Sequence, residues 1–447
     1  MSINLHIGNN HTLYLIHTTF INSLITLRPH QERTLDKLKQ FNKGCVYIPT
    51  GGGKTIIMLE DLVSRIETAD APLTVVIVAP RLLLANQLCS EFIEYTQDND
   101  NIVLNDNLNI LHVHSGETDF DSSTKPRYIH EWIVDRQFLS QHQIIFSTYH
   151  SLGRIDDAMI DVDIMYCDEA HNATQRNHFV GVASTATNAS NSYFFTATPK
   201  YTRQTNGRGM NNTDVFGNTL ISVPAPELID NGSIIPPKLV IHETDHVRTK
   251  KNAPDVDREM VLEILDDLTE EQSAKVLVAA PNTTILWRML SQTNLLDILK
   301  QLGYDVLHIT SKHGAYVNDK KVGRDVFFNT LTEWGRDDNK KFVVFHYSIL
   351  SEGINVPGLT HTILLRNLPV IEMAQTIGRV IRLHKEDADN IAKGNIPVGN
   401  YQLYRKSHGV VTVPLCGKAS LSTRNRLQKI IELIFVDGLP AHSFANT

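Results

Sequence analysis

The stretch 49–55, PTGGGKT, constrains the fold of this chain more than any other part of its sequence. It follows a short apolar run at 44–48 and precedes a stretch in which apolar residues recur at helical spacing. Glycines let a backbone curl so that successive N–H groups face phosphate oxygens, and the start of a helix adds the positive end of its dipole. This order of strand, glycine loop and helix predicts a phosphate-binding loop in an α/β domain.

The residue types in this loop suit a nucleoside triphosphate. We expect Lys54 to reach the β- and γ-phosphates of ATP and Thr55 to hold Mg²⁺. The other loop residues expected around the nucleotide are Thr50, Gly51, Gly52 and Gly53. The strict GxxxxGKS/T pattern is not met, because Ile48 stands at its first glycine position. A glycine-rich turn that only happens to precede Lys-Thr is the alternative, and the flanking strand and helix argue against it.

A second motif, CDEAH at 167–171, ends another apolar run. Asp168, at the end of the expected strand, is placed to hold the magnesium through a water, and Glu169 to align and deprotonate the attacking water. Taken alone, an acidic turn after a strand is a fair alternative. Because two independent motifs occur in the expected order, ATP hydrolysis is the better interpretation.

Short β-branched runs alternate with helical patterns in both halves of the chain, which is typical of parallel α/β sheets. The clearest runs lie at 44–48, 73–79, 143–148, 163–167 and 192–197, and then at 275–280, 304–309, 341–346, 360–365 and 409–414. A proline-bearing stretch at 223–239 separates the two sets. We therefore predict an N-terminal extension at 1–24 and two domains, 25–235 and 236–447. We expect the polar stretch 97–109 to be a surface loop.

The composition is that of an ordinary globular protein of more than one domain, with 447 residues, 42% of them hydrophobic and 20% charged. The 4 cysteines form no CxxC pair, which favours a reducing compartment, the cytoplasm, and argues against a zinc site. No segment is apolar enough to cross a membrane, and the first residues lack the basic region of a signal peptide. The net charge of −7 gives no general attraction for nucleic acid, so such binding requires a local groove.

The motifs between 27 and 385 resemble, in unbroken order, those of superfamily 2 helicases of the DEAH-lettered, restriction-subunit-like kind. The resemblance implies an α/β fold of two tandem RecA-like domains with parallel sheets and an ATP site in the cleft between them. In such helicases a glutamine reads adenine, and the segment LRPHQ at 27–31 supplies Gln31, with Arg28 beside it. A helix start that carries a proline is the alternative for this segment alone.

Three further segments resemble family motifs that contact the nucleic-acid strand or couple it to the nucleotide. APRLLLANQ at 79–87 implies a phosphate contact from Arg81, and STYHSL at 147–152 implies one from Thr148. TATP at 196–199 implies coupling between the two sites through Thr196 and Thr198, together with His171 of CDEAH. Ordinary strand-to-helix loops are the alternative for each segment, since hydroxyl side chains cap helices anyway.

In the second half, SEGINVPG at 351–358 resembles the motif that contacts both the ribose and the bound strand. The resemblance assigns the nucleotide contact to Asn355 and strand contacts to Glu352 and Gly353. Many relatives have aspartate where this chain has Asn355, so a hydrogen bond to the ribose remains expected but its charge is lost.

QTIGRVIR at 375–382 resembles the arginine-finger motif QxxGRxxR and implies catalytic roles for Gln375, Arg379 and Arg382. Two arginines three positions apart share one face of a helix, so we expect both to reach the γ-phosphate from across the cleft. A guanidinium there stabilises charge that develops on the transferring phosphoryl group. A helix with solvated arginines is the alternative.

The function that the resemblance implies is an ATP-dependent DNA helicase or translocase, with ATP and Mg²⁺ as cofactors and single-stranded or branched DNA as its partner. The compact length resembles phage-encoded branch-migration helicases, which act on forks and recombination junctions. Two alternatives remain open. One is an RNA helicase of the same superfamily, and the other is a nucleotide-dependent switch ATPase that binds a partner protein and does not move along a strand.

Overall fold

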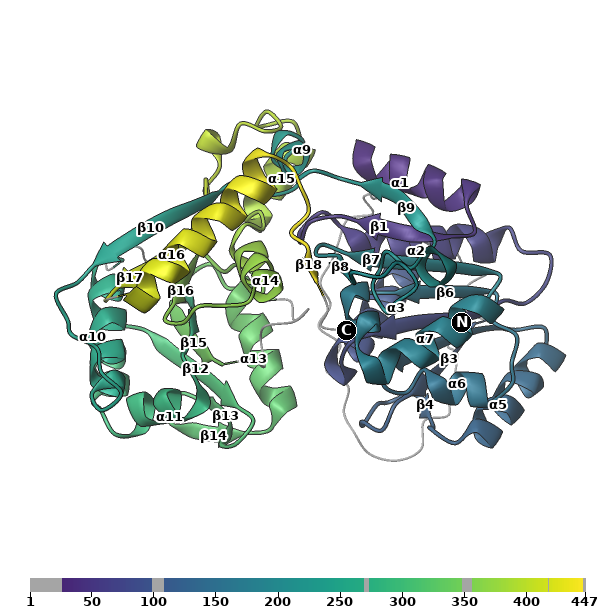
Figure 1. Ribbon diagram of the computed structural model, residues 1–447, viewed down its shortest axis with the longest axis horizontal. Coiled ribbons are helices and arrows are strands. Elements are labelled where there is room, and N and C mark those ends of the chain that lie inside the picture. The colour runs from purple at the N-terminus through teal and green to yellow at the C-terminus, as the bar shows by residue number, and fades with distance from the viewer. Residues whose placement is uncertain (1–25, 99–107, 269–272, 348–355, 417, 445–447) are drawn as a thin grey trace, which may run out of the picture.

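The computed structural model describes residues 26–98, 108–268, 273–347, 356–416 and 418–444, so the predicted extension at 1–24 lies outside the described residues. Within these ranges the chain forms two eight-stranded sheets, each covered by helices, which lie side by side (Figure 1). None of the helices in these ranges combines the length and the hydropathy required to cross a bilayer.

All strand pairs in the first sheet are parallel, in the order β4-β3-β5-β2-β6-β7-β1-β9. Its strands are β1 Lys43–Tyr47, β2 Thr74–Ala79, β3 Leu108–Val113, β4 Asp121–Ser122, β5 His142–Thr148, β6 Ile164–Cys167, β7 Asn191–Thr196 and β9 Asn218–Ser222. The helices of this half are α1 Pro29–Gln40, α2 Lys54–Glu67, α3 Leu82–Asp98, α5 Pro126–Phe138, α6 Gly153–Asp157, α7 Arg176–Asn188, α8 Thr213–Phe216 and α9 Ala225–Asp230. Because β6, β7 and β1 are neighbours and parallel, the motifs that follow them meet at the carboxyl ends of these three strands.

The second sheet has the order β10-β17-β16-β11-β15-β12-β13-β14, and its pairs are parallel except β12–β13 and β13–β14. Its strands are β10 Pro237–Glu243, β11 Lys275–Ala279, β12 Asp305–Thr310, β13 Gly314–Val317, β14 Lys320–Val322, β15 Phe342–His346, β16 His361–Leu364 and β17 Gly409–Leu415. The helices of this half are α10 Ala253–Asp266, α11 Thr283–Ser291, α12 Leu295–Gln301, α13 Arg324–Arg336, α14 Val370–Val380, α15 Lys385–Ala392 and α16 Lys418–Ile431, which continues as a π-helical turn, Glu432–Val436. The predicted fold class, two tandem parallel-sheet α/β domains, is confirmed.

The central strands explain why the sequence predicted this architecture. β2 (TVVIVA) and β11 (KVLVA) are buried along their whole length. A strand covered by helices on both faces needs an uninterrupted apolar run, which is what the sequence shows at these positions. The outer strands of the two sheets are more polar, and most of them were not predicted.

The prediction of a surface loop at 97–109 is wrong at both of its ends. The helix α3 continues to Asp98, and β3 begins at Leu108; residues 99–107 lie outside the described ranges. The strand was missed because Asn109 and His112 interrupt its apolar run, whereas in the fold the side chain of His112 is buried between aromatic rings.

The end of the chain joins the two halves. β17 lies between β10 and β16, so it completes the second sheet. Beyond α16, the short strand β18 (Ser443–Phe444) pairs with β8 (Lys200–Tyr201) of the first half. The predicted boundary between 235 and 236 falls in the connection between α9 and β10.

Candidate active site

The phosphate loop connects β1 to α2 at the carboxyl end of the first sheet. Gly51 and Gly53 have φ angles of 90° and 79°, a left-handed conformation that glycine adopts without steric cost. α2 begins at Lys54, so the N–H groups of its first turn and the positive end of its dipole are available to an anion. The Lys54 Nζ atom donates to the carbonyl oxygen of Ile48 over 3.3 Å, which keeps the charge within the loop.

Two side chains of α1 support this loop. Gln31 is buried, accepts a 2.8 Å hydrogen bond from the backbone N–H of Arg28, and lies so near Gly53 that a Cβ there would collide with its amide nitrogen. His30 is also buried, and its Nε2 atom lies 2.8 Å from the carbonyl oxygen of Gly52. His30 was not among the predicted residues, although it belongs to the same LRPHQ segment. Both side chains therefore fix the shape of the loop from the side of α1.

The two acidic residues of CDEAH follow β6, also at the carboxyl end of the first sheet, and both are buried. Burial, together with the charge of Glu169, raises the pKa of Asp168, and the charge of Lys54 opposes that shift. Glu169 has a φ of 46°, so the backbone turns sharply after the strand. The Tyr149 hydroxyl holds this turn by donating to the carbonyl oxygen of Asp168 over 2.7 Å. Two adjacent buried carboxylates suit a hard divalent cation, and Thr55 lines the same cleft.

The three predicted coupling residues lie together. His171, in the 3₁₀ helix Ala170–Thr174, has its Nδ1 atom 3.0 Å from Thr196 Oγ1 and 3.5 Å from Thr198 Oγ1. The backbone N–H of Thr198 donates to Thr196 Oγ1 over 3.1 Å. The same His171 nitrogen is 3.5 Å from Glu169 Oε2. A buried chain of polar contacts thus runs from the acidic motif to the loop after β7.

A cleft of about 570 Å³ lies between the phosphate loop and the second domain. That volume is in the range of small-molecule sites, roughly 300–1,000 Å³. The predicted nucleotide-site residues that line it are Arg28, Gln31, Thr50, Gly51, Gly52, Gly53, Lys54, Thr55, Asp168, Glu169, Gln375, Arg379 and Arg382. The fold therefore brings together residues from the first predicted motif, at 27–31, and the last, at 375–382.

The second domain reaches the cleft through α14. Gln375 is 4% exposed, and within the described ranges neither atom of its side-chain amide has a hydrogen-bond partner. Buried amides are nearly always paired in folded proteins, so this side chain is available to a ligand. Arg379, also buried, lies one turn further along the same helix.

Arg382 does not share that helix face, so this part of the prediction is wrong. α14 ends at Val380, and Arg382 forms an isolated antiparallel bridge with Ile234. The backbone N–H of Ile235 donates to the carbonyl oxygen of Ile381 over 2.9 Å, which fixes an extended conformation just beyond the helix. Arg382 still lines the cleft from this extended segment.

The cleft also contains residues that the sequence did not predict, among them Gln87 and Glu91 of α3. Gln87 Nε2 donates to Glu91 Oε1 over 2.7 Å. Burial raises the pKa of Glu91, while the charge of Arg382 acts in the opposite direction. Their spacing of one helical turn was visible, but only the tertiary fold shows that this face of α3 meets the cleft.

A second and larger cleft, of about 960 Å³, also lies between the domains. It contains the predicted strand contacts Arg81 and Thr148, and the second domain contributes Arg324 at the start of α13. Thr148 Oγ1 donates to Ser151 Oγ over 3.2 Å. The predicted residues Glu352, Gly353 and Asn355 lie outside the described residues.

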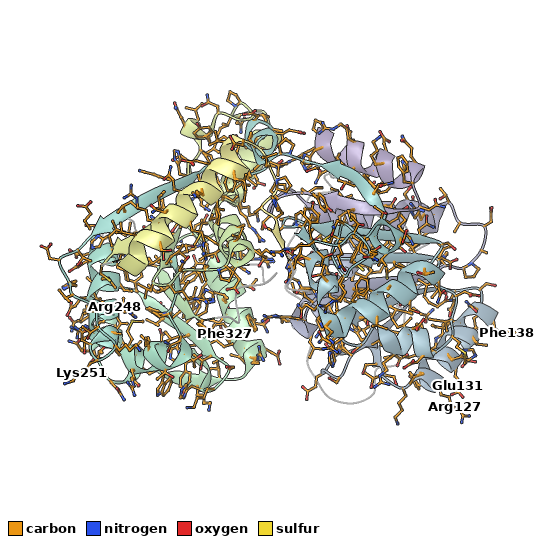
Figure 2. The ribbon with its side chains drawn as sticks, viewed as in Figure 1. Arg127, Glu131, Phe138, Arg248, Lys251 and Phe327 are labelled. Atoms are coloured by element: carbon orange, nitrogen blue, oxygen red, sulfur yellow. The ribbon has the colours of Figure 1, made fainter. Side chains whose placement is uncertain are left out.

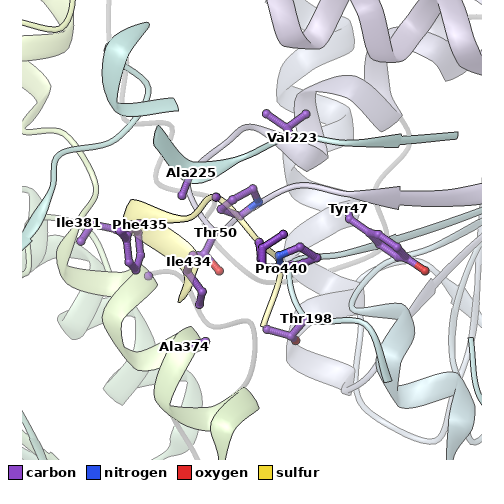
Figure 3. A pocket seen from close by; sticks show the side chains of 15 residues that line it. Tyr47, Thr50, Thr198, Val223, Ala225, Ala374, Ile381, Ile434, Phe435 and Pro440 are labelled. Atoms are coloured by element: carbon purple, nitrogen blue, oxygen red, sulfur yellow. The ribbon is translucent and has the colours of Figure 1, made fainter. Parts of the chain in front are cut away.

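The segment after α16 packs between the domains beside the phosphate loop (Figure 3). Ile434, Phe435 and Pro440 line an apolar pocket with Thr50 and Thr198. The tail of the chain, for which the sequence suggested no role, thus lies beside both the 49–55 loop and the loop after β7.

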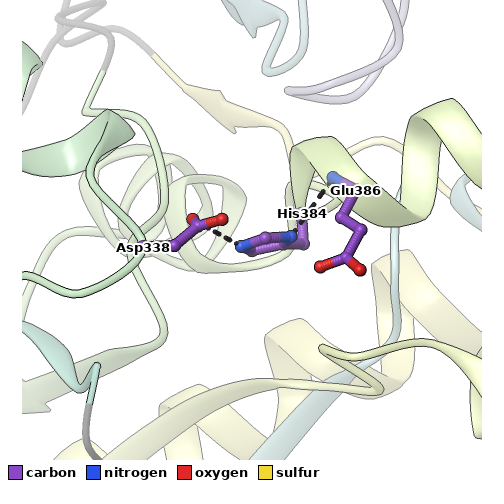
Figure 4. Close-up of side chains that lie close together, drawn as sticks. All are labelled: Asp338, His384 and Glu386. Atoms are coloured by element: carbon purple, nitrogen blue, oxygen red, sulfur yellow. Dashed lines mark hydrogen bonds and ion pairs between the residues drawn. The ribbon is translucent and has the colours of Figure 1, made fainter.

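Asp338, His384 and Glu386 form a separate group of titratable side chains (Figure 4). His384 Nε2 lies 2.9 Å from Asp338 Oδ1, while His384 Nδ1 accepts from the backbone N–H of Glu386. The Arg405 guanidinium is 3.4 Å from Asp338 and 2.8 Å from Glu386. Because Arg405 already supplies the positive charge, this group is an ion-pair network that caps α15.

Residues 24–201 match the protein family described as "Type III restriction enzyme, res subunit". Among proteins of curated function, none matches the sequence. Similar solved structures include the ATP-dependent Type ISP restriction-modification enzyme LlaBIII bound to DNA, with a TM-score of 0.66 and 14% identity, over 92% of this chain and 30% of that one. They also include the DEAD-box helicase Mss116 bound to ssRNA, with a TM-score of 0.55 and 16% identity, over 94% of this chain and 75% of that one.

A third similar structure is S. cerevisiae Dbp5 bound to RNA and ADP BeF3, with a TM-score of 0.54 and 18% identity, over 93% of this chain and 88% of that one. The fold is that of tandem RecA-like helicase domains. This chain spans less than a third of the length of LlaBIII, because it covers 30% of that enzyme.

Proposed function

We propose that this chain is a superfamily 2 ATP hydrolase that uses Mg-ATP to move along, remodel or unwind nucleic acid. The observation that carries the proposal is the cleft of about 570 Å³, in which Lys54 and Glu169 of the first domain lie opposite Arg379 of the second. The groups that act together in phosphoryl transfer come from two different domains. Hydrolysis therefore depends on the closing and opening of the cleft between them. The family match of residues 24–201 and the helicase fold support the same conclusion.

The predicted residues of the cleft have different parts in this chemistry. Gln31 and Arg28 bind the adenine end, and the loop N–H groups with Lys54 bind the phosphates. Glu169 accepts the proton of the attacking water. Thr55 and Asp168 would hold Mg²⁺, which supplies positive charge against the phosphate oxygens when it is bound.

The second domain completes the site. Arg379 and Arg382 stabilise the charge that develops on the transferring phosphoryl group, and Gln375 lies beside them. Asn355 remains the expected contact to the ribose. Loss of the γ-phosphate removes the group that joins the two walls, so the cleft opens after hydrolysis.

The nucleic-acid strand lies in the larger cleft, where Arg81 and Thr148 hold its phosphates from one side. Glu352 and Gly353 are the expected contacts from the other side. The contacts among His171, Thr196 and Thr198 connect the nucleotide to this region. Alternate gripping by the two domains moves the protein along the backbone with little sequence preference.

The finer proposal is that the strand is DNA, in branched structures such as forks and four-way junctions. The similar enzyme LlaBIII was solved bound to DNA. At a junction each broken base pair is offset by one that re-forms, whereas unwinding long duplex works against stacking of about 1–2 kcal/mol per step. Two motor domains that pull on a backbone suffice for the first task.

An RNA substrate is the second candidate, because the similar helicases Mss116 and Dbp5 were solved bound to RNA. The deciding experiment measures ATP hydrolysis and strand separation on a mobile DNA junction, a tailed DNA duplex and a matched RNA duplex at one salt concentration. Preference for the junction supports the proposal, and unwinding of RNA alone supports the alternative. Hydrolysis that none of the three stimulates would instead indicate a switch ATPase.

A further inference from the structure

The wall of the larger cleft carries an exposed aromatic residue that the strand-contact motifs do not include. Phe120 lies in the connection between β3 and β4, lines this cleft and remains 39% exposed. The connection also places Ser115, Gly116 and Thr118 along the same wall. Exposure of a large ring has a free-energy cost in water, and the backbone contacts of Arg81 and Thr148 do not require it.

The Phe120 ring is held by a stack of rings behind it. Its centroid lies 5.6 Å from that of His112, with an angle of 16° between the planes. His112 is fully buried and stacks in turn on Phe146, with centroids 5.5 Å apart and planes at 25°. Phe120 therefore presents a ring whose orientation is set by the sheet beneath it.

Hydrogen bonds fix the middle ring of this stack. His112 Nδ1 lies 2.9 Å from Nε2 of His114, and that nitrogen is also 3.2 Å from Asn86 Oδ1 on α3. The backbone N–H of Gly116 donates to the other nitrogen of His114 over 3.2 Å. Burial lowers the pKa of His112 to about 4, so the stack is neutral at physiological pH.

Charges of both signs surround Phe120, because Glu117, Asp119 and Asp325 line the same cleft as two arginines. Arg81 lies on the same domain, and Arg324 lies at the start of α13 on the other domain. Proteins that bind single strands combine basic contacts to the phosphates with aromatic rings on which successive bases stack, whatever their sequence. The larger cleft offers Arg81 and Arg324 for the phosphates and the Phe120 ring for a base. A base inside a duplex has no free face, so a ring of this kind distinguishes unpaired from paired nucleotides.

We propose that Phe120 is a stacking platform for an unpaired base of the bound strand, while Arg81 and Thr148 hold the backbone. This inference rests on the proposed nucleic-acid function. It makes single-stranded nucleic acid the class of ligand that the larger cleft takes, and it places one base against the ring that His112 supports.

The test compares two fluorescent oligonucleotides of equal length, one with normal bases and one with the same backbone and abasic sites. Binding is measured by anisotropy for the parent and for Phe120→Ala, Phe120→Leu and Phe120→Trp. Leucine keeps the packing on His112 without an aromatic face, and tryptophan keeps the face. Phe138→Ala is the matched control, because Phe138 is 88% exposed at the outer end of α5 and remote from the clefts (Figure 2).

The parent is expected to bind the strand with bases more tightly than the abasic strand. Phe120→Ala and Phe120→Leu should lose roughly tenfold in affinity for the strand with bases and little for the abasic one, while Phe120→Trp and Phe138→Ala retain the preference. Arg81→Ala should weaken both strands alike. Equal binding of both strands by the parent, or equal losses on both in Phe120→Ala, overturns the platform and leaves the proposed function standing. A parent that binds neither strand overturns the proposed function itself.

Discussion

Gly378 of α14 lies so close to Thr50 of the phosphate loop that a Cβ added to the glycine would be 2.5 Å from the Cβ of Thr50. This approach places the helix that carries Arg379 directly against the 49–55 loop. Substitution by alanine would favour the helix itself by about 1 kcal/mol, so any loss must come from the contact between the domains.

We therefore predict that Gly378→Ala reduces ATP hydrolysis by roughly 10²-fold, since a misplacement of about 1 Å at reacting groups has that effect. Steady-state phosphate release measures it. Gly153→Ala is the control, because that glycine is also helical and a Cβ there meets nothing within 4 Å. Equal rates for Gly378→Ala and the parent would show that the close approach is not needed for hydrolysis.

Lys54→Ala should leave a folded protein with almost no hydrolysis, a loss of roughly 10²–10³-fold or more. The hydrogen bond from Lys54 to the carbonyl of Ile48 contributes little to folding, so the Tm should change by only a few degrees. Lys251→Ala, at the outer edge of the second domain (Figure 2), is the control for loss of a lysine charge. Normal turnover in a folded Lys54→Ala protein would refute the phosphate-loop assignment.

Arg379→Ala and Arg382→Ala should bind ATP almost normally but hydrolyse it roughly 10³-fold more slowly, because an arginine finger acts on transition-state charge. Binding is measured with a fluorescent ATP analogue and turnover by phosphate release. Since Arg379 is buried and Arg382 is only partly so, Arg379→Ala should also lower the Tm more. An unchanged kcat in either variant would remove that arginine from the catalytic set.

Glu169→Gln should trap an ATP-bound, strand-bound state, because the amide keeps the shape of the carboxylate but cannot accept the proton of water. Strand affinity with ATP and magnesium should then exceed the affinity without nucleotide. The comparison is made by anisotropy on one oligonucleotide at one salt concentration. If nucleotide leaves the affinity of this variant unchanged, the two clefts are not coupled as proposed.

Asp168→Asn should make the metal-free protein more stable, by about 1 kcal/mol or more, because burial beside Glu169 disfavours the Asp168 charge. The same substitution should abolish the rise in Tm that Mg²⁺ produces in the parent, together with hydrolysis. Urea unfolding in EDTA and thermal unfolding with and without Mg²⁺ measure the two effects. A variant that is less stable without metal would show that Asp168 holds the fold in its own right.

The parts that the sequence predicted are those whose chemistry needs particular residues next to one another. A phosphate loop needs its glycines and lysine in one short stretch, and the central strands need continuous apolar runs. The placement of Glu91 and Arg382 depends on segments distant in the chain. Glu91 meets the cleft because of how α3 packs, and Arg382 is extended because Ile235 binds the backbone of Ile381.

The sheet edges were harder to predict because they are shorter and more polar. β3 carries Asn109 and His112, and the β13–β14 hairpin consists of only a few residues with exposed lysines. The platform at Phe120 depends on β3, so its residues could not be placed together before the fold was known.

The position of β17 between β10 and β16 has a consequence for the order in which the protein folds. During synthesis β10 emerges long before β17, its neighbour in the sheet, and until then its backbone edge can pair with other chains. The strands of the first sheet are all complete by Ser222, so that domain can fold while the ribosome still makes the second. The first domain of a nascent chain can therefore form first, and the second domain, which carries Arg379 and Arg382, must wait for residues 409–415.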